Sequence, residues 1–230
     1  MRNPSELKIP LEAGAVTTAL AYPAAARPAE AALILGHGAG AGQHSAFMVE
    51  FAQAISALGV DVVTFNFPYI EQHRRIPDRG PALEACFRSV IATVHAEVES
   101  ATRALFIGGK SMGGRIATQV AALDRTLPIA GLVLLGYPLH PPGRHTERRD
   151  KHLPAVGRPM LFVQGTRDGF GTPAELTPIA NDIGPSATIH AVAGGDHSLK
   201  LARKDPAAQA AIYDDVQRTT VEWIRRVTGR

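Results

Sequence analysis

The chain has 230 residues, 45% of them hydrophobic and 20% charged, which is enough apolar material to bury a substantial core and excludes a disordered protein. Its 24 Lys and Arg residues against 21 Asp and Glu residues leave a formal charge of +3, too small and too dispersed for the basic face of a nucleic-acid-binding protein. The single cysteine, Cys86, excludes an intramolecular disulfide, and its apolar helical surroundings in sequence predict a buried structural thiol.

Segment 1–10 carries charges and proline where a signal peptide would need an apolar run. No stretch approaches the roughly 18 apolar residues of a membrane-spanning helix. The sequence therefore predicts a cytoplasmic protein without membrane contact.

The first predicted elements are two strands over residues 7–9 and 15–21, which have no helix between them and suit an antiparallel entry at a sheet edge. From about residue 30, short apolar runs alternate with amphipathic segments, which is typical of a parallel sheet with helices on both faces. The predicted strands of this series are 32–35, 60–66, 104–107, 129–135, 160–164 and 188–192. Helical patterns lie near 46–58, 81–98, 112–123, 173–182 and 207–227. Six parallel strands and five helices without a marked boundary predict one α/β domain over residues 1–230.

Two connections, 67–80 and 136–158, are long, rich in proline and charge, and without a helical or strand period. Loops of this length in a compact domain are usually functional or disordered. Both would leave the carboxyl ends of strands, where open α/β sheets bind their ligands.

Residues 108–114, GGKSMGG, join a short buried strand to a helix and contain the pattern G-x-S-x-G. Such a turn exposes the serine at a strained bend, where Gly109 and Gly113 give room and the Met112 amide faces a developing oxyanion. Ser111 is therefore the predicted nucleophile; the alternative is a glycine-rich turn with a capping serine. Lys110 is either catalytic or a solvated turn lysine.

A serine hydroxyl needs a base, and the base needs an orienting acid. Asp168 follows the strand at 160–164 and His197 follows the strand at 188–192, so both would lie at carboxyl ends. The order Ser, Asp, His is the one that this type of turn accompanies. Asp168 is the predicted acid and His197 the predicted base, whereas Asp196 is interpreted as a turn residue.

A second oxyanion donor is expected from the loop after the first parallel strand, residues 36–42, GHGAGAG. Glycines let backbone amides point inward there, and Ala39 is the chosen donor, with Gly40 as the near alternative. His37 is interpreted as a residue that braces this loop.

Together these motifs resemble the lidless, dienelactone-hydrolase-like branch of the α/β-hydrolase superfamily, in a subgroup with the hydrolase-like domain of a subunit of the NSL histone-acetyltransferase complex. The resemblance rests on residues 36–42, 108–115, 136–143, 162–171 and 194–198. It implies a mostly parallel, roughly eight-stranded sheet without a cap domain, and it carries a catalytic triad onto Ser111, Asp168 and His197. Dienelactone hydrolases use a cysteine nucleophile where this chain has serine, so lactone specificity is not expected.

The expected activity is that of a serine carboxylesterase on small or short-acyl esters, proceeding through an acyl-enzyme without metal or cofactor. The expected partner is a small-molecule ester, bound by a monomer or a homodimer. Because an imidazole base is idle once protonated, activity should fall from neutral pH toward pH 5. The NSL resemblance leaves a second possibility, an interaction or scaffold module with weak or no catalysis.

The connection 136–158 holds Tyr137 and a concentration of basic residues: His140, Arg144, His145, Arg148, Arg149, Lys151 and His152. It is either a flap that attracts an anionic substrate or a solvated charged loop. Zinc binding by its three histidines is not predicted, since neither ligand spacing nor a carboxylate partner is recognisable.

Nucleotide binding is disfavoured. A P-loop ending at residues 109–111 would need glycine at position 104, which is Ala104. A dinucleotide fingerprint over 36–41 would need an acidic residue at the end of the next strand, where Asn66 stands.

Overall fold

The computed structural model describes residues 3–25 and 28–229, except for the side chain of Ala13. The first two residues of segment 1–10 and the last residue of the predicted domain therefore lie outside the described part. Eight strands form one sheet: β1 (Ser5–Pro10), β2 (Val16–Tyr22), β3 (Ala32–Gly36), β4 (Asp61–Phe65), β5 (Leu105–Lys110), β6 (Gly131–Leu135), β7 (Met160–Gly165) and β8 (Ala187–Val192).

The strand order is β1-β2-β4-β3-β5-β6-β7-β8. β1 pairs antiparallel with β2, and β2 pairs antiparallel with β4, so the predicted antiparallel entry at the sheet edge is confirmed. All pairs from β4 to β8 are parallel, as predicted. Parallel strands end at a common edge of the sheet, and the loops that follow β3, β5, β7 and β8 therefore meet there.

The helices are α1 (Ala46–Ala57), α2 (Pro68–Glu71), α3 (Gly80–Glu97), α4 (Glu99–Arg103), α5 (Met112–Leu123), α6 (Pro173–Ile183) and α7 (Pro206–Thr228), with 3-10 turns η1 (Glu12–Gly14) and η2 (Leu153–Ala155). The five predicted helices are confirmed within two residues at each end. α2 and α4 were not predicted, because elements of four and five residues are too short to show a helical period. The long connections hold only α2 and η2, so no cap domain is inserted in either of them.

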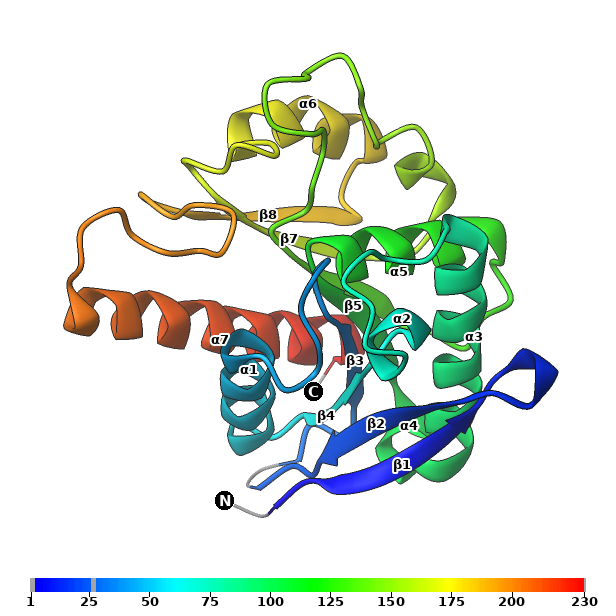
Figure 1. Ribbon diagram of the computed structural model, residues 1–230. Coiled ribbons are helices and arrows are strands. Elements are labelled where there is room, and N and C mark those ends of the chain that lie inside the picture. The colour runs from blue at the N-terminus through cyan, green and yellow to red at the C-terminus, as the bar shows by residue number, and fades with distance from the viewer. Residues whose placement is uncertain (1–2, 26–27, 230) are drawn as a thin grey trace.

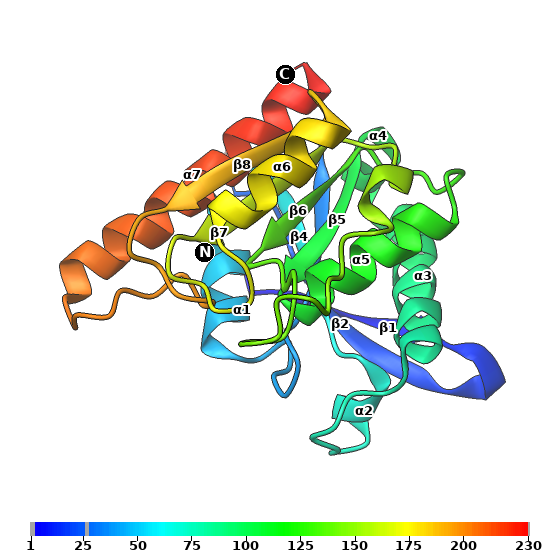
Figure 2. The same cartoon turned by 90° about the horizontal axis from the view of Figure 1, so that it is seen from above.

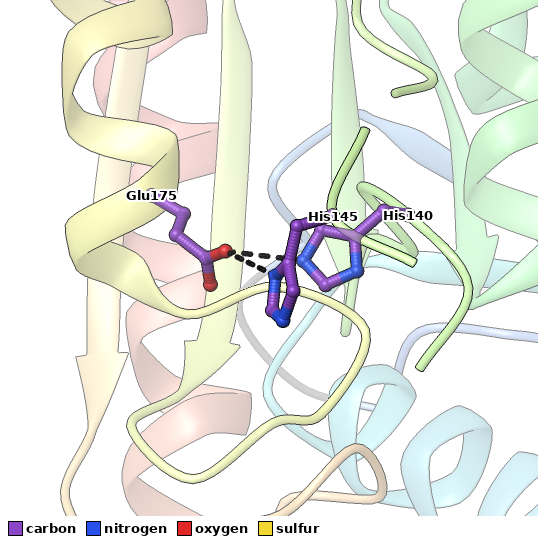
Figure 3. Close-up of side chains that lie close together, drawn as sticks. All are labelled: His140, His145 and Glu175. Atoms are coloured by element: carbon purple, nitrogen blue, oxygen red, sulfur yellow. Dashed lines mark hydrogen bonds and ion pairs between the residues drawn. The ribbon is translucent and has the colours of Figure 1, made fainter. Parts of the chain in front are cut away.

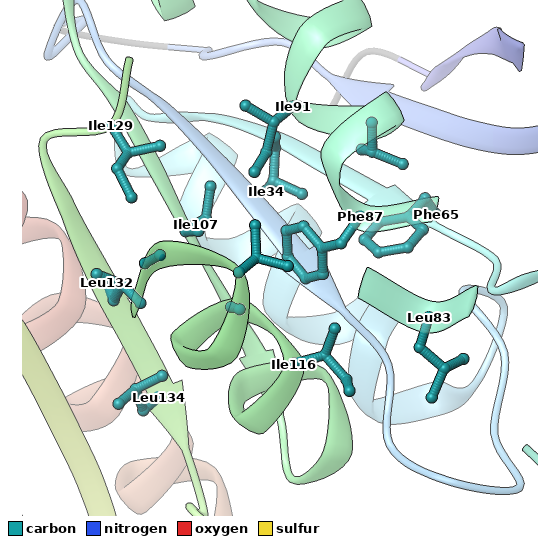
Figure 4. Close-up of a cluster of buried hydrophobic side chains, with 14 of the residues drawn as sticks. Ile34, Phe65, Leu83, Phe87, Ile91, Ile107, Ile116, Ile129, Leu132 and Leu134 are labelled. Carbon is teal, nitrogen blue, oxygen red and sulfur yellow. The ribbon is translucent and has the colours of Figure 1, made fainter. Parts of the chain in front are cut away.

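Helices cover both faces of the sheet (Figures 1 and 2). On one face, a buried cluster joins the sheet to α3, α5 and α6 through residues such as Phe87, Ile116 and Leu176. Figure 4 shows the part of this cluster between the sheet, α3 and α5. On the other face, Phe51 of α1 and Trp223 of α7 belong to the second cluster. Burial on both faces explains why the central strands are apolar throughout rather than alternating.

β5 continues three residues beyond its predicted end at Ile107, through Gly108 to Lys110. Gly108 pairs with Leu35 of β3 and Val133 of β6. A Cβ atom at Gly108 would lie 1.8 Å from the Val133 carbonyl oxygen. Glycine at this position therefore allows β5 to pack closely against β6, and it does not mark the end of the strand. The strand consequently delivers the next residue, Ser111, to the carboxyl edge of the sheet.

Within residues 3–25 and 28–229, no helix combines the length and the apolar character that crossing a bilayer requires.

Candidate active site

Ser111 connects β5 to α5 and has a φ of 51° and a ψ of −111°. A positive φ is costly for a residue with a side chain, so the surrounding backbone must enforce it. The Ser111 amide donates to the Leu135 carbonyl of β6, which ties the turn to the sheet. The side chain makes no capping hydrogen bond to α5, and the alternative of a capping serine is therefore wrong.

The two glycines of the pattern pack against β3. A Cβ atom at Gly109, whose φ is 146°, would lie 2.1 Å from the Gly36 carbonyl oxygen, and one at Gly113 would lie 2.2 Å from the same atom. Any side chain at either position would push α5 and the Ser111 turn away from the sheet. Both neighbours of the serine must therefore lack a side chain, as predicted from the sequence.

The three predicted site residues from three different loops lie in one hydrogen-bonded series. The Ser111 hydroxyl is 2.8 Å from His197 Nε2, and His197 Nδ1 is 2.8 Å from Asp168 Oδ2. The Asp168 side chain is fully buried, whereas that of His197 is 21% exposed. The buried carboxylate and the accessible imidazole edge leave the serine end of the series open to a ligand.

The partners fix the tautomer of His197. A carboxylate only accepts hydrogen bonds, so Nδ1 carries the proton toward Asp168 and Nε2 presents its lone pair to the Ser111 hydroxyl. The Phe170 ring stacks on the imidazole, with centroids 4.1 Å apart, and limits its rotation. This is the protonation state that a general base needs.

Gln164 is a buried site residue that the sequence reading missed. Its Nε2 donates to Asp168 Oδ2 at 2.8 Å and to the carbonyls of Gly171 and Tyr137, while the Phe170 amide donates to Asp168 Oδ1 at 2.8 Å. Both carboxylate oxygens are thereby oriented. The available signal was one polar residue at the end of the otherwise apolar run 160–164.

Lys110 is buried, so the alternative of a solvated turn lysine is wrong. Its ammonium group donates a hydrogen bond to the His197 carbonyl and lies 5.8 Å from the centre of the Phe47 ring. Burial lowers the pKa of Lys110 to about 8. The contact is with the His197 backbone, and it anchors the loop that presents the imidazole.

The amides of Ala39 and Met112 form no hydrogen bond within the described part of the chain, and both residues line the cavity that contains Ser111. The Gly40 amide, by contrast, donates to the Tyr69 hydroxyl at 3.3 Å. Gly38 lies next to the Ser111 turn, because a Cβ atom at Gly38 would be 3.8 Å from the Ser111 Cβ. Of the two predicted donors, the Gly40 amide is therefore already engaged, whereas the Ala39 amide is free within the described residues.

His37 is buried and connects the loop to the segment after β4. Its Nδ1 lies 2.8 Å from the Gly38 carbonyl oxygen, and its Nε2 accepts from the Phe67 amide at 3.1 Å. A nitrogen that accepts cannot also carry a proton, so the neutral ring is required. Burial lowers the pKa of His37 to about 4, and the predicted bracing interaction is present.

A cavity of about 630 Å³ lies beside Ser111 and His197, a size typical of small-molecule sites. Its apolar lining includes Phe47, Met48, Leu83 and Phe170. Its charged lining consists of Lys110, Arg115, Arg149, Lys200 and Asp78. Cations outnumber anions on this wall, and Asp78 is already paired with Arg74.

The basic loop 136–158 divides into three kinds of residue. Arg149 reaches the cavity, whereas Arg144 and Arg148 are exposed and pair with Glu147 and Asp150. His140 is buried, and with His145 it contacts Glu175 of α6; His152 instead contacts the Thr118 hydroxyl. Glu175 is a carboxylate partner that the sequence reading did not recognise.

Two further predictions about single residues are confirmed. Asp196 is a turn residue, since its Oδ1 accepts from the amides of Ser198 and Lys200. Cys86 is a buried free thiol, and burial raises its pKa to about 12. A thiol in that state is not a nucleophile at neutral pH.

Residues 29–225 match the family model described as an alpha/beta hydrolase domain, and the chain belongs to this family. The eight-stranded, mostly parallel sheet with helices on both faces is the α/β-hydrolase fold, as predicted from the sequence.

Solved structures share this fold over almost their whole length. A lidless serine hydrolase from Xanthomonas campestris has 18% identity and a TM-score of 0.72, with 97% of this chain and 96% of that chain covered. The esterase domain of a Rhodothermus marinus protein has 14% identity and a TM-score of 0.72, covering 98% and 99%. Est1E from Butyrivibrio proteoclasticus with bound ferulic acid has 14% identity and a TM-score of 0.72, covering 95% and 99%. At these identities the likeness concerns the fold alone.

Proposed function

We propose that the protein is a serine hydrolase that cleaves carboxylic esters, with Ser111 as nucleophile, His197 as base and Asp168 as orienting acid. The observation that carries the proposal is the unbroken hydrogen-bonded series from the Ser111 hydroxyl to the buried Asp168 carboxylate. The serine end of this hydrogen-bonded series lies in a cavity of about 630 Å³, which is large enough for a small ester.

In the acylation step, His197 Nε2 takes the hydroxyl proton while Ser111 Oγ attacks the ester carbonyl carbon. Asp168 stabilises the imidazolium that results, and Gln164 and the Phe170 amide hold that carboxylate in place. The imidazolium then returns the proton to the departing alcohol. Water attacks the acyl-enzyme by the same route in the second half of the reaction.

The amides of Ala39 and Met112 form the oxyanion hole in this proposal. Neither donates a hydrogen bond elsewhere in the described structure, and Met112 begins the 12-residue helix α5, whose dipole favours negative charge there. One such donor typically contributes about 3 kcal/mol to transition-state stabilisation. Met112 and Ala39 are therefore expected to act together on the developing alkoxide.

The proposed substrate is a small or short-acyl ester that also carries an acidic group. Arg115 and Arg149 both line the cavity, and neither forms an ion pair with a carboxylate in the described residues. Within the described residues, the Arg115 guanidinium donates only to the Gln119 side-chain oxygen, and burial together with the neighbouring Arg149 lowers the pKa of Arg115. An anionic group between the two guanidiniums would relieve their mutual repulsion and complete their hydrogen bonds.

The test is labelling by a fluorophosphonate probe and hydrolysis of p-nitrophenyl esters of increasing acyl length. Ser111→Ala should abolish labelling and lower kcat by at least about 10⁴-fold, because the nucleophile is lost. Ser45→Ala is the matched control, since Ser45 lines the same cavity but is not among the hydrogen-bond partners of the His197 side chain in the described residues, and it should be labelled like the unmodified protein.

The competing function is an interaction module, which the resemblance to the NSL-complex domain suggests. A folded protein that neither reacts with the probe nor hydrolyses any ester of the panel would favour that module over the esterase. Subgroup membership, the oligomeric state of monomer or homodimer, and a cytoplasmic location stay predictions.

A further inference from the structure

A second cluster of chemically active side chains lies apart from the Ser111 series, where loop 136–158 meets the start of α6. It consists of His140, His145 and Glu175, and Figure 3 shows both imidazoles turned toward one carboxylate oxygen. His140 Nε2 is 3.1 Å and His145 Nδ1 is 3.2 Å from Glu175 Oε1. The proposed ester hydrolysis uses none of these three residues.

The hydrogen bonds of His140 leave an electrostatic problem. Its Nδ1 is 2.9 Å from the Pro141 carbonyl oxygen, and its Nε2 faces the Glu175 carboxylate. Both partners are acceptors only, so a neutral ring would turn a lone pair toward one of them. The contacts are satisfied either by an imidazolium, in a side chain that is 1% exposed, or by a cation held between Nε2 and Oε1.

The distances fit a metal ion. Zinc lies about 2.0–2.2 Å from imidazole nitrogen and carboxylate oxygen in a tetrahedral site, which places neighbouring ligand atoms roughly 3.3 Å apart. The two nitrogen–oxygen separations of 3.1 and 3.2 Å match that edge. All three ligand atoms lie within 4.8 Å of one another, and His145 is 67% exposed on a loop that can close the remaining edge.

The hydrogen-bond partners of His140 and Glu175 are also typical of a metal site. Metal-binding histidines usually donate their second nitrogen to a backbone carbonyl, as His140 does to Pro141. The second oxygen of Glu175 accepts from the amide and the hydroxyl of Thr172, in the capping box of α6.

We propose that His140, His145 and Glu175 form a zinc site that fastens loop 136–158 to α6. Two imidazoles and one carboxylate are a ligand set that Zn²⁺ accepts, and the exposed side of His145 leaves the fourth position to water. The site is structural in this proposal: it fixes the loop that carries Pro138 and Arg149 into the cavity beside Ser111.

Binding is measured on the full chain after treatment with EDTA, by competition for Zn²⁺ with a chromophoric chelator at pH 7.5. The expected result is one Zn²⁺ per chain with a Kd below about 10 µM. Loss of a residue that only hydrogen-bonds to a metal ligand typically costs 10–100-fold in metal affinity. Loss of a ligand itself should cost more, so His145→Ala and Glu175→Gln should each weaken Zn²⁺ binding by about 100-fold or more. His44→Ala, at an exposed histidine outside the cluster, should bind like the unmodified protein.

Trypsin provides a second readout that needs no activity. Arg144 and Arg148 are exposed in the loop, and Zn²⁺ should slow cleavage after them in the unmodified protein but not in His145→Ala. Because His145 lies on the surface, that variant is expected to fold, and circular dichroism checks this. Absence of stoichiometric binding would establish a histidine–glutamate ion pair instead, and equal binding by His145→Ala and Glu175→Gln would place the zinc elsewhere; either result overturns the proposal.

Discussion

Three histidines of this chain differ in role because their hydrogen-bond partners differ. His37 accepts a hydrogen bond from an amide and must be neutral, whereas His197 donates to a carboxylate and accepts from a hydroxyl. His140 faces acceptors on both sides. Identical side chains thus become a brace, a proposed base and a proposed metal ligand, and the hydrogen-bond partner determines which.

Arg115 and Arg149 should set the preference for acidic esters. Replacing Arg115 with Gln removes one charged hydrogen-bond donor, and such a bond is worth about 1.5–3 kcal/mol. We expect kcat/KM for the mono-p-nitrophenyl ester of succinic acid to fall by roughly 10–100-fold, while that for p-nitrophenyl butyrate changes little. Arg88→Gln, at an exposed arginine of α3 that does not line the cavity, serves as the control. Equal losses on both esters would argue against a charge contact with substrate.

Among the secondary-structure elements, the close contact of β3 with β5 and α5, referred to below as the β3–α5 seam, positions the turn that carries Ser111. Gly36 of β3 touches both Gly109 and Gly113, so strand and helix approach backbone to backbone. The closeness of this seam holds Ser111 at its positive φ, in a conformation that an isolated peptide would rarely adopt. Packing between elements therefore maintains the local strain at the turn.

Gly113→Ala tests this seam. The added Cβ atom would lie 2.2 Å from the Gly36 carbonyl oxygen, and the clash should lower the free energy of unfolding by about 3 kcal/mol or prevent folding. Gly80→Ala is the matched control at the start of α3, where the nearest atom would be 3.6 Å away, and it should stay within about 0.5 kcal/mol. Urea denaturation measures both, and equal stabilities for the two variants would refute a close seam.

At the scale of the whole molecule, the parallel sheet gathers residues that are far apart in sequence. Ser111 follows β5, Asp168 follows β7 and the turn bearing His197 follows β8, all at the carboxyl edge. The two buried clusters on opposite faces hold the sheet rigid beneath them. A site assembled in this way is lost when the protein unfolds. The lowest pH at which the proposed enzyme works, its acid limit, therefore depends on the stability of the whole fold as well as on the protonation of the proposed base.

His37 should contribute to that acid limit. Its pKa in the folded chain is about 4 against an ordinary value of 6.5, so the unfolded chain binds more protons between these values. Stability is then fully present above pH 6.5 and falls as the pH drops toward 4, by about 3 kcal/mol for this group. His37→Gln, which keeps an acceptor for the Phe67 amide, should show a correspondingly shallower decline in urea unfolding between these pH values. Parallel curves for the two proteins would exclude His37 as the source.

Local sequence patterns were sufficient to predict the parallel sheet, its antiparallel entry, the five longer helices and the three residues that meet at the carboxyl edge. Each of these follows from a local pattern: apolar runs, helical periodicity, or a chemically distinctive residue just past a strand. The glycines two positions before and after Ser111 could also be explained from the sequence, because a turn of this type leaves no room for side chains at those positions.

The remaining features depend on contacts between segments that are distant in sequence, so they are visible only in the folded chain. The burial of Lys110 against the His197 carbonyl, the support of Asp168 by Gln164, and the meeting of His140 and His145 with Glu175 involve partners that no local pattern links. The helices α2 and α4 form one turn each, and packing rather than periodicity specifies them. Hydrogen-bond partners and burial are properties of the folded chain, and they determine what each of these residues can do.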